Sequence, residues 1–146
     1  MAWAMATVVF FALAVLGLGA LTLATAQDLI DEPGLGALPG ALAMIVALAV
    51  FSIGLAVVLR APRPRFVSSV FLAFSAALAH LVALWLGALI AGAGPAAATA
   101  IVGRFVLGGA SALITVAALL AAFGGIAARR SRSGTPRWPW EGDGVP

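Results

Sequence analysis

The chain has 146 residues, of which 64% are hydrophobic and only 9% are charged, with a formal net charge of +3. Soluble domains usually carry about a quarter charged residues, so this composition excludes an ordinary water-soluble fold. The absence of cysteine excludes disulfides, thiolate metal sites and a catalytic thiol.

Four long apolar stretches occupy most of the chain: 2–26, 38–59, 66–91 and 97–128. Each has about the 20 apolar residues that an α-helix needs to cross a hydrocarbon layer of about 30 Å. We therefore expect an all-α integral membrane protein with four transmembrane helices in an up-down bundle, forming one domain over residues 1–130. Residues 131–146 are expected to form a partly disordered cytoplasmic tail that is basic and rich in Trp and Pro.

The first stretch ends in Ala24-Thr25-Ala26, a small-residue pattern typical of signal-peptidase cleavage. Residues 1–7 carry no positive charge, however, and the apolar run is much longer than a signal core of 7–15 residues. We expect the stretch to be retained as a membrane span. Cleavage after Ala26 is the alternative, and it would leave three spans.

The connections between the stretches differ in charge. The first, 27–39, carries three acidic residues and no arginine, and the third, 92–96, carries no charge. Seven of the eight basic residues lie in the second connection and the tail: Arg60, Arg63, Arg65, Arg129, Arg130, Arg132 and Arg137. Positive residues in short loops stay on the cytoplasmic side of a membrane. We therefore expect a multi-pass protein of the bacterial cytoplasmic membrane with both termini inside.

Two of the stretches carry a face of small residues at helical spacing. In the third stretch these are Ser69, Ala73, Ala76, His80, Ala83 and Gly87. In the fourth they are Gly108, Ser111, Ala112, Thr115, Ala118, Ala122 and Gly125. Close packing of small residues brings helices together in lipid, so we expect these faces to meet and Trp85, on the opposite side, to face lipid. The alternative is that a composition rich in Ala and Gly scatters small residues without such a role.

His80 is the one histidine and lies near the middle of the third stretch. An ionisable group at this depth is a candidate functional site. No Asp, Glu or Lys lies within a span, so we expect a neutral ring that seeks one hydrogen-bond donor and one acceptor. Thr115 lies at a similar depth, and Ser52 lies within about a turn of it. A structural hydrogen bond from His80 to one of these hydroxyls is the main prediction, and a ligand or proton-transfer role is the alternative.

Arg104 is the one charged residue within the four apolar stretches. It precedes Arg129 by 25 residues, which is about 37 Å of helix, so Arg104 can lie at the outer interface with its side chain extended to water. We expect it to pair with an acidic residue of the first connection, Asp28, Asp31 or Glu32. The functional alternative is an anion-binding group at the outer mouth of the bundle.

The tail contains Trp138 and Trp140 among Arg and Pro residues. Trp prefers the headgroup layer and Arg favours anionic lipid, so we expect Arg60, Arg63, Arg65, Arg129, Arg130, Trp138 and Trp140 to anchor the protein at the membrane interface. A short extended peptide that a partner binds is the alternative for the tail, because Pro136 and Pro139 would keep it extended.

Two segments resemble those of an uncharacterised family: Pro136-Arg137-Trp138-Pro139-Trp140-Glu141 and Asp28-Leu29-Ile30-Asp31-Glu32-Pro33. The family consists of small four-span membrane proteins of actinobacteria and is defined as a domain of unknown function. The resemblance covers the whole four-span layout and implies no activity and no catalytic residues. An actinobacterial origin would also account for the use of Arg as the basic residue and the absence of Lys and Asn.

The sequence contains no Gly-rich phosphate loop, no cluster of metal ligands and no Ser/His/Asp set. We therefore expect neither an enzyme nor a bound cofactor, and the scattered arginines do not predict nucleic-acid binding. The leading hypothesis is an accessory or scaffold subunit whose partners are the lipid bilayer and a membrane protein or a second copy. The alternative is a small transporter or channel for an uncharged or anionic solute, with His80 and Arg104 along its path.

Overall fold

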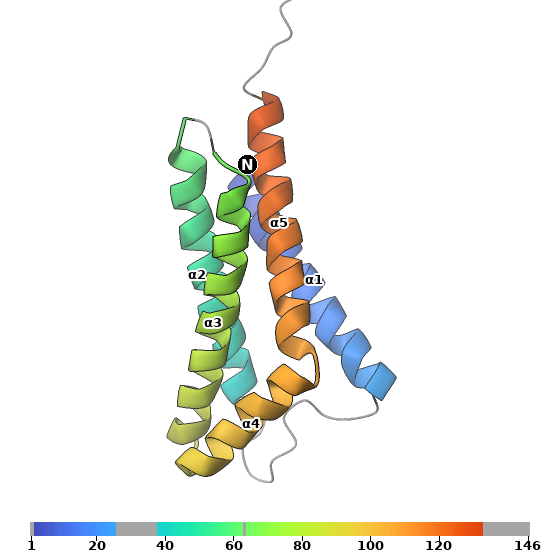
Figure 1. Ribbon diagram of the computed structural model, residues 1–146, viewed down its shortest axis with the longest axis vertical. Helices are drawn as coiled ribbons and strands as arrows, with labels where there is room; N and C mark the ends of the chain where they lie inside the picture. The colour runs from blue at the N-terminus through green and yellow to red at the C-terminus, as the bar shows by residue number, and fades with distance from the viewer. Residues whose placement is uncertain (1, 26–37, 63, 133–146) are drawn as a thin grey trace, which may run out of the picture.

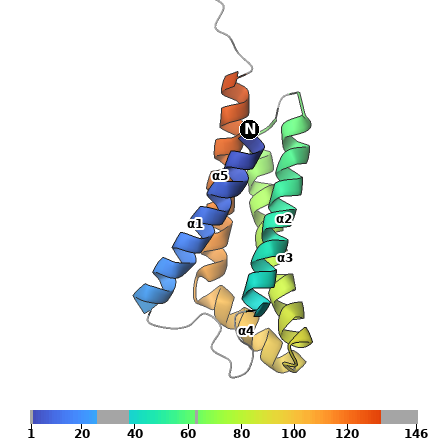
Figure 2. The ribbon, with the colours of Figure 1, turned by 180° about the vertical axis from the view of Figure 1, so that it is seen from behind.

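The computed structural model describes residues 2–25, 38–62 and 64–132, and all the regular structure in them is helical. The helices are α1 (Ala2–Thr25), α2 (Leu38–Arg60), α3 (Val67–Ile90), α4 (Pro95–Leu107) and α5 (Ala110–Arg132). The four long helices run alternately up and down, and α4 lies obliquely at one end of the bundle (Figures 1 and 2). This arrangement confirms the predicted all-α, up-down bundle.

Four helices are long and apolar enough to cross a membrane: α1, α2, α3 and Ala110–Ser131 of α5. Many of their large apolar side chains point away from the fold; Leu16 and Phe71 are 69% and 70% exposed. A monomer in water rarely exposes so much contiguous apolar surface, whereas lipid tails solvate it without cost. The helix lengths and the outward-facing side chains together support an integral membrane protein.

The prediction of one continuous helix over 97–128 was wrong. Two helices, α4 and α5, replace it, and Gly109 between them has a φ of +83°, a left-handed conformation that glycine adopts without strain. With 13 residues, α4 is about 20 Å long and too short to cross the hydrocarbon layer. Gly108 and Gly109 therefore separate two helices. The sequence instead predicts Gly108 on a face of small packing residues.

The core combines alanines with a few large side chains. The largest fully buried side chains are Phe10, Phe51, Leu55, Leu84, Ile101, Ile114, Ile126 and Pro39. Phe10 of α1 and Phe51 of α2 pack with their ring centroids 4.6 Å apart. The Trp3 indole N–H donates a hydrogen bond of 2.8 Å to the carbonyl of Ser52, which also ties α1 to α2.

Small residues allow the helices to approach closely, as the sequence predicts. A methyl group added at Gly125 of α5 would lie 2.9 Å from Cβ of Ala6, and one added at Gly87 of α3 would lie 3.2 Å from Cα of Pro39. The predicted small face of α3 is mostly buried, with Ala83 half-buried. The face predicted for the fourth stretch is only partly right: Ala118, Ala122 and Gly125 are buried, but Ala112 is exposed.

The buried face of α5 instead passes through Ala110, Ile114, Ala117 and Ala121. The predicted face was chosen by small side-chain size, so it left out the buried Ile114. It included Ala112, which lies on the outward side of α5. Trp85 also differs from its prediction, because it is half-buried and its indole N–H donates to the Thr99 hydroxyl at 3.2 Å. The helix α4 folds back beside α3 and covers a side that would otherwise face lipid.

Candidate functional site

His80 lies past the middle of α3 and is 2% exposed. Its imidazole ring stacks on Phe105 of α4, with the centroids 5.0 Å apart and the planes at 29°. Among the described residues, Ser69 is the other buried polar side chain, and its hydroxyl donates to the backbone carbonyl of Phe66. His80 is thus an imidazole enclosed by the bundle, with α4 covering it.

The structure does not form the predicted hydrogen bond between His80 and Thr115. The Thr115 hydroxyl donates to the carbonyl of Ser111, one turn earlier in α5, at 2.8 Å. The carbonyl of Ala43 on α2 lies beside the ring, but within the described part of the chain neither ring nitrogen makes a hydrogen bond of normal geometry. The sequence prediction failed because a threonine in a helix can satisfy its hydroxyl with its own backbone.

A buried polar group without a hydrogen bond costs about 1–3 kcal/mol of stability. Leucine would fill a similar volume without that cost, so His80 is the strongest candidate for a functional group in the interior. A neutral imidazole there can donate one hydrogen bond and accept another. No described residue is an Asp or a Glu, and the described chain contains no group of three His, Cys, Asp or Glu side chains placed to hold a metal ion.

Arg104 lies in the last turn of α4, and its side chain is exposed. The next residue, Phe105, is buried against His80, so α4 directs one side chain outward and the other inward. Asp28, Asp31 and Glu32, its predicted partners, lie outside the described residues, and the pairing stays a prediction. The structure therefore brings Phe105 of α4, and not Arg104, onto His80 of α3.

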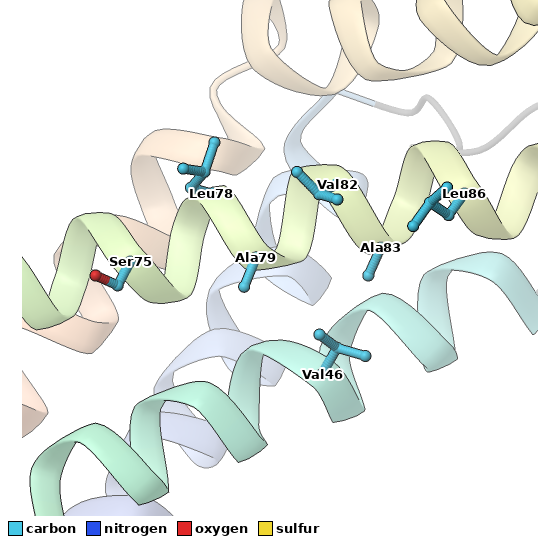
Figure 3. Close-up of a pocket in the computed structure, with 7 residues that line it drawn as sticks. All are labelled: Val46, Ser75, Leu78, Ala79, Val82, Ala83 and Leu86. Atoms are coloured by element: carbon cyan, nitrogen blue, oxygen red, sulfur yellow. The ribbon is translucent and has the colours of Figure 1, made fainter. Parts of the chain in front are cut away.

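An apolar groove runs along the outer side of α2 and α3 (Figure 3). Its volume is about 470 Å³, and its lining residues are Val46, Ser75, Leu78, Ala79, Val82, Ala83 and Leu86. Val46 of α2 points toward Ala79 and Ala83 of α3, which form the small-residue part of the groove. The Ser75 hydroxyl donates to the carbonyl of Phe71, so this groove presents a mainly apolar surface to its surroundings.

The opposite end of the bundle from α4 is basic. Arg60, Arg65, Arg129 and Arg130 are all exposed there, whereas Arg63, Trp138 and Trp140 lie outside the described residues. The Arg130 guanidinium carbon lies 4.9 Å from the centroid of the Phe66 ring, which stacks on Phe123 at 4.6 Å. Sequence reasoning missed this aromatic stack, although the spacing of Phe123 and Arg130, seven residues or about two turns, places both on one side of α5.

A model of a family of unknown function matches residues 1–145. The chain belongs to this family, DUF6121. Membership confirms the predicted resemblance to a family without an assigned function, while the four-span layout of that family and its actinobacterial origin stay predictions. No curated protein and no solved structure matches the DUF6121 chain.

Proposed function

We propose that this protein is a non-enzymatic accessory or scaffold subunit of the bacterial cytoplasmic membrane, which presents apolar helix faces to a larger membrane protein. The packing of the bundle centre carries this proposal. Alanines and large apolar side chains fill it, and His80 and Ser69 are the buried polar side chains of the described residues. A transporter needs a polar cavity that reaches at least one side of the membrane.

The groove on α2 and α3 supports a role in helix docking. Ala79 and Ala83 keep the groove low beside Val46 of α2, and Leu78, Val82 and Leu86 flank them with larger apolar side chains. Transmembrane helices associate through such close contacts between small residues and their larger neighbours. We infer that one transmembrane helix of the partner protein packs along this groove.

The arginine-rich end of the bundle supports an orientation with both termini inside the cell. Arg60, Arg65, Arg129 and Arg130 gather where α2 and α5 end and where α3 begins. Short basic segments remain on the cytoplasmic side, so α4 and Arg104 lie on the outer side of the membrane in this proposal.

Purification of the tagged, full-length chain in a gentle detergent tests the proposal when three variants are compared. We expect a defined membrane complex that survives His80→Leu, because a scaffold needs no imidazole in its core. Removing the unbonded ring should also raise the stability of the isolated chain by about 1 kcal/mol. Ala83→Phe should release the partner by filling the groove, whereas Ala112→Phe, the same change at an exposed alanine of α5, should retain it.

The runner-up function, a small transporter or channel, has one observation in its favour: the buried His80 ring without a hydrogen bond. If His80→Leu abolishes solute movement in reconstituted vesicles while the bundle stays folded, this alternative replaces the scaffold proposal. Loss of the partner in both Ala83→Phe and Ala112→Phe would also contradict docking at the groove, because the disruption would then not depend on position.

A further inference from the structure

The arginine-rich end is the strongest concentration of charge in the described structure. The exposed side chains there are Arg60, Arg65, Arg129 and Arg130, and Figure 1 shows the end of α5 rising beside the start of α3. The described part of this end therefore carries several positive charges within a short stretch of three neighbouring segments. This end therefore attracts anions at the level of the membrane surface.

An aromatic stack lies beside one of these cations, Arg130. Phe66 precedes α3, and its ring stacks on Phe123 of α5 with a plane angle of 27°. The Arg130 guanidinium lies over the Phe66 ring, at a distance typical of a cation–π contact. Because Phe123 is 51% exposed, the stack leaves an apolar surface open to lipid tails, and Arg130 lies about 10 Å further along the helix axis.

We propose that this end is a binding site for an anionic phospholipid. Arg65 and Arg129 contact its phosphate, and the exposed side of Phe123 contacts the upper part of an acyl chain. Guanidinium groups suit the phosphate because their planar fork can donate two parallel hydrogen bonds to its oxygens. The cation–π contact between Arg130 and Phe66 adds a positive charge beside Arg65 and Arg129.

The combination of cations with an exposed aromatic surface favours a whole lipid over a free anion. A dissolved phosphate ion would contact the guanidinium groups alone and would gain nothing from Phe123. A zwitterionic lipid offers the same phosphate, but its own ammonium group competes with the arginines. An anionic phospholipid satisfies both the charge and the apolar part of the site.

Native mass spectrometry of the full-length chain tests this proposal, with phosphatidylglycerol and phosphatidylcholine supplied in equal amounts. We expect preferential retention of phosphatidylglycerol. Arg129→Gln should reduce that preference about five-fold, which is the usual contribution of one basic residue near an anionic surface. Arg104→Gln is the matched control, since it removes an exposed arginine at the other end of the bundle and should leave the preference unchanged.

Further measurements keep the test decisive. If Arg129→Gln does not fold, Arg65→Gln removes a cation of the same site from the connection before α3 and should have the same effect. Excess inorganic phosphate should fail to displace phosphatidylglycerol; displacement would show a bare anion site and overturn the proposal. Equal retention of the two lipids by the wild type, or an equal loss in Arg104→Gln and Arg129→Gln, would overturn it as well.

Discussion

Replacing Phe51 with alanine should destabilise the bundle by about 2 kcal/mol. Phe51 is fully buried and packs against the ring of Phe10, so the change opens a cavity where α1 meets α2. In soluble cores a Phe→Ala change costs about 3–5 kcal/mol, of which part is the transfer of the side chain from water. Lipid replaces water here and removes most of that part, which leaves the lost packing contacts as the main cost.

Phe71→Ala is the matched control for this prediction, because Phe71 is 70% exposed and faces outward from α3. We expect it to change stability by less than about 0.5 kcal/mol. Unfolding of both variants by SDS in mixed micelles, followed by circular dichroism, measures the difference. A loss of stability in Phe71→Ala as large as that in Phe51→Ala would contradict the described packing, since the two rings would then be equally important to the fold.

Gly125→Leu should cost about 3 kcal/mol, at the upper end of the usual cost of overpacking a core. Even a methyl group at this position would lie 2.9 Å from Cβ of Ala6 and 3.6 Å from Cδ2 of Leu55. Leucine adds three more carbons in the same direction, so α1, α2 and α5 would have to separate. We expect a large fall in the thermal stability of the purified protein and a low yield of the folded form.

The neighbouring Gly124 supplies the control. A side chain added there would meet nothing within 4 Å, so Gly124→Leu should fold and melt like the wild type. The two variants share the substitution, the helix and the depth in the membrane to within one residue. Equal melting temperatures for Gly124→Leu and Gly125→Leu would show that α1 does not pack against α5 in the way described.

The positions of the membrane spans could be predicted from sequence because they depend on long apolar runs and on little else. The first three helices begin and end within about one residue of the predicted stretches. The helix α4 could not be predicted in this way, because its residues are as apolar as those of a span. What separates it from α5 is the backbone conformation of Gly109, which a hydropathy pattern does not contain.

The surroundings of His80 were only partly predictable. Its burial follows from its place on the small-residue face of α3, and the structure confirms that burial. The contact between His80 and Phe105 could not be predicted. A continuous fourth span would have run in a different direction and placed Phe105 elsewhere relative to α3. The break at Gly108-Gly109 turns α4 toward α3 and brings the Phe105 ring onto the imidazole.

The central proposal is that this chain crosses a membrane four times with its arginine-rich end inside the cell. Labelling single cysteines with a membrane-impermeant thiol reagent tests it cleanly, because the chain has no cysteine of its own. Ala96→Cys at the start of α4 should react in intact cells, and Ala61→Cys after α2 should react only once the membrane is permeabilised. Immediate labelling of Ala61→Cys in intact cells, or a chain that stays monodisperse in buffer without detergent, would contradict the account.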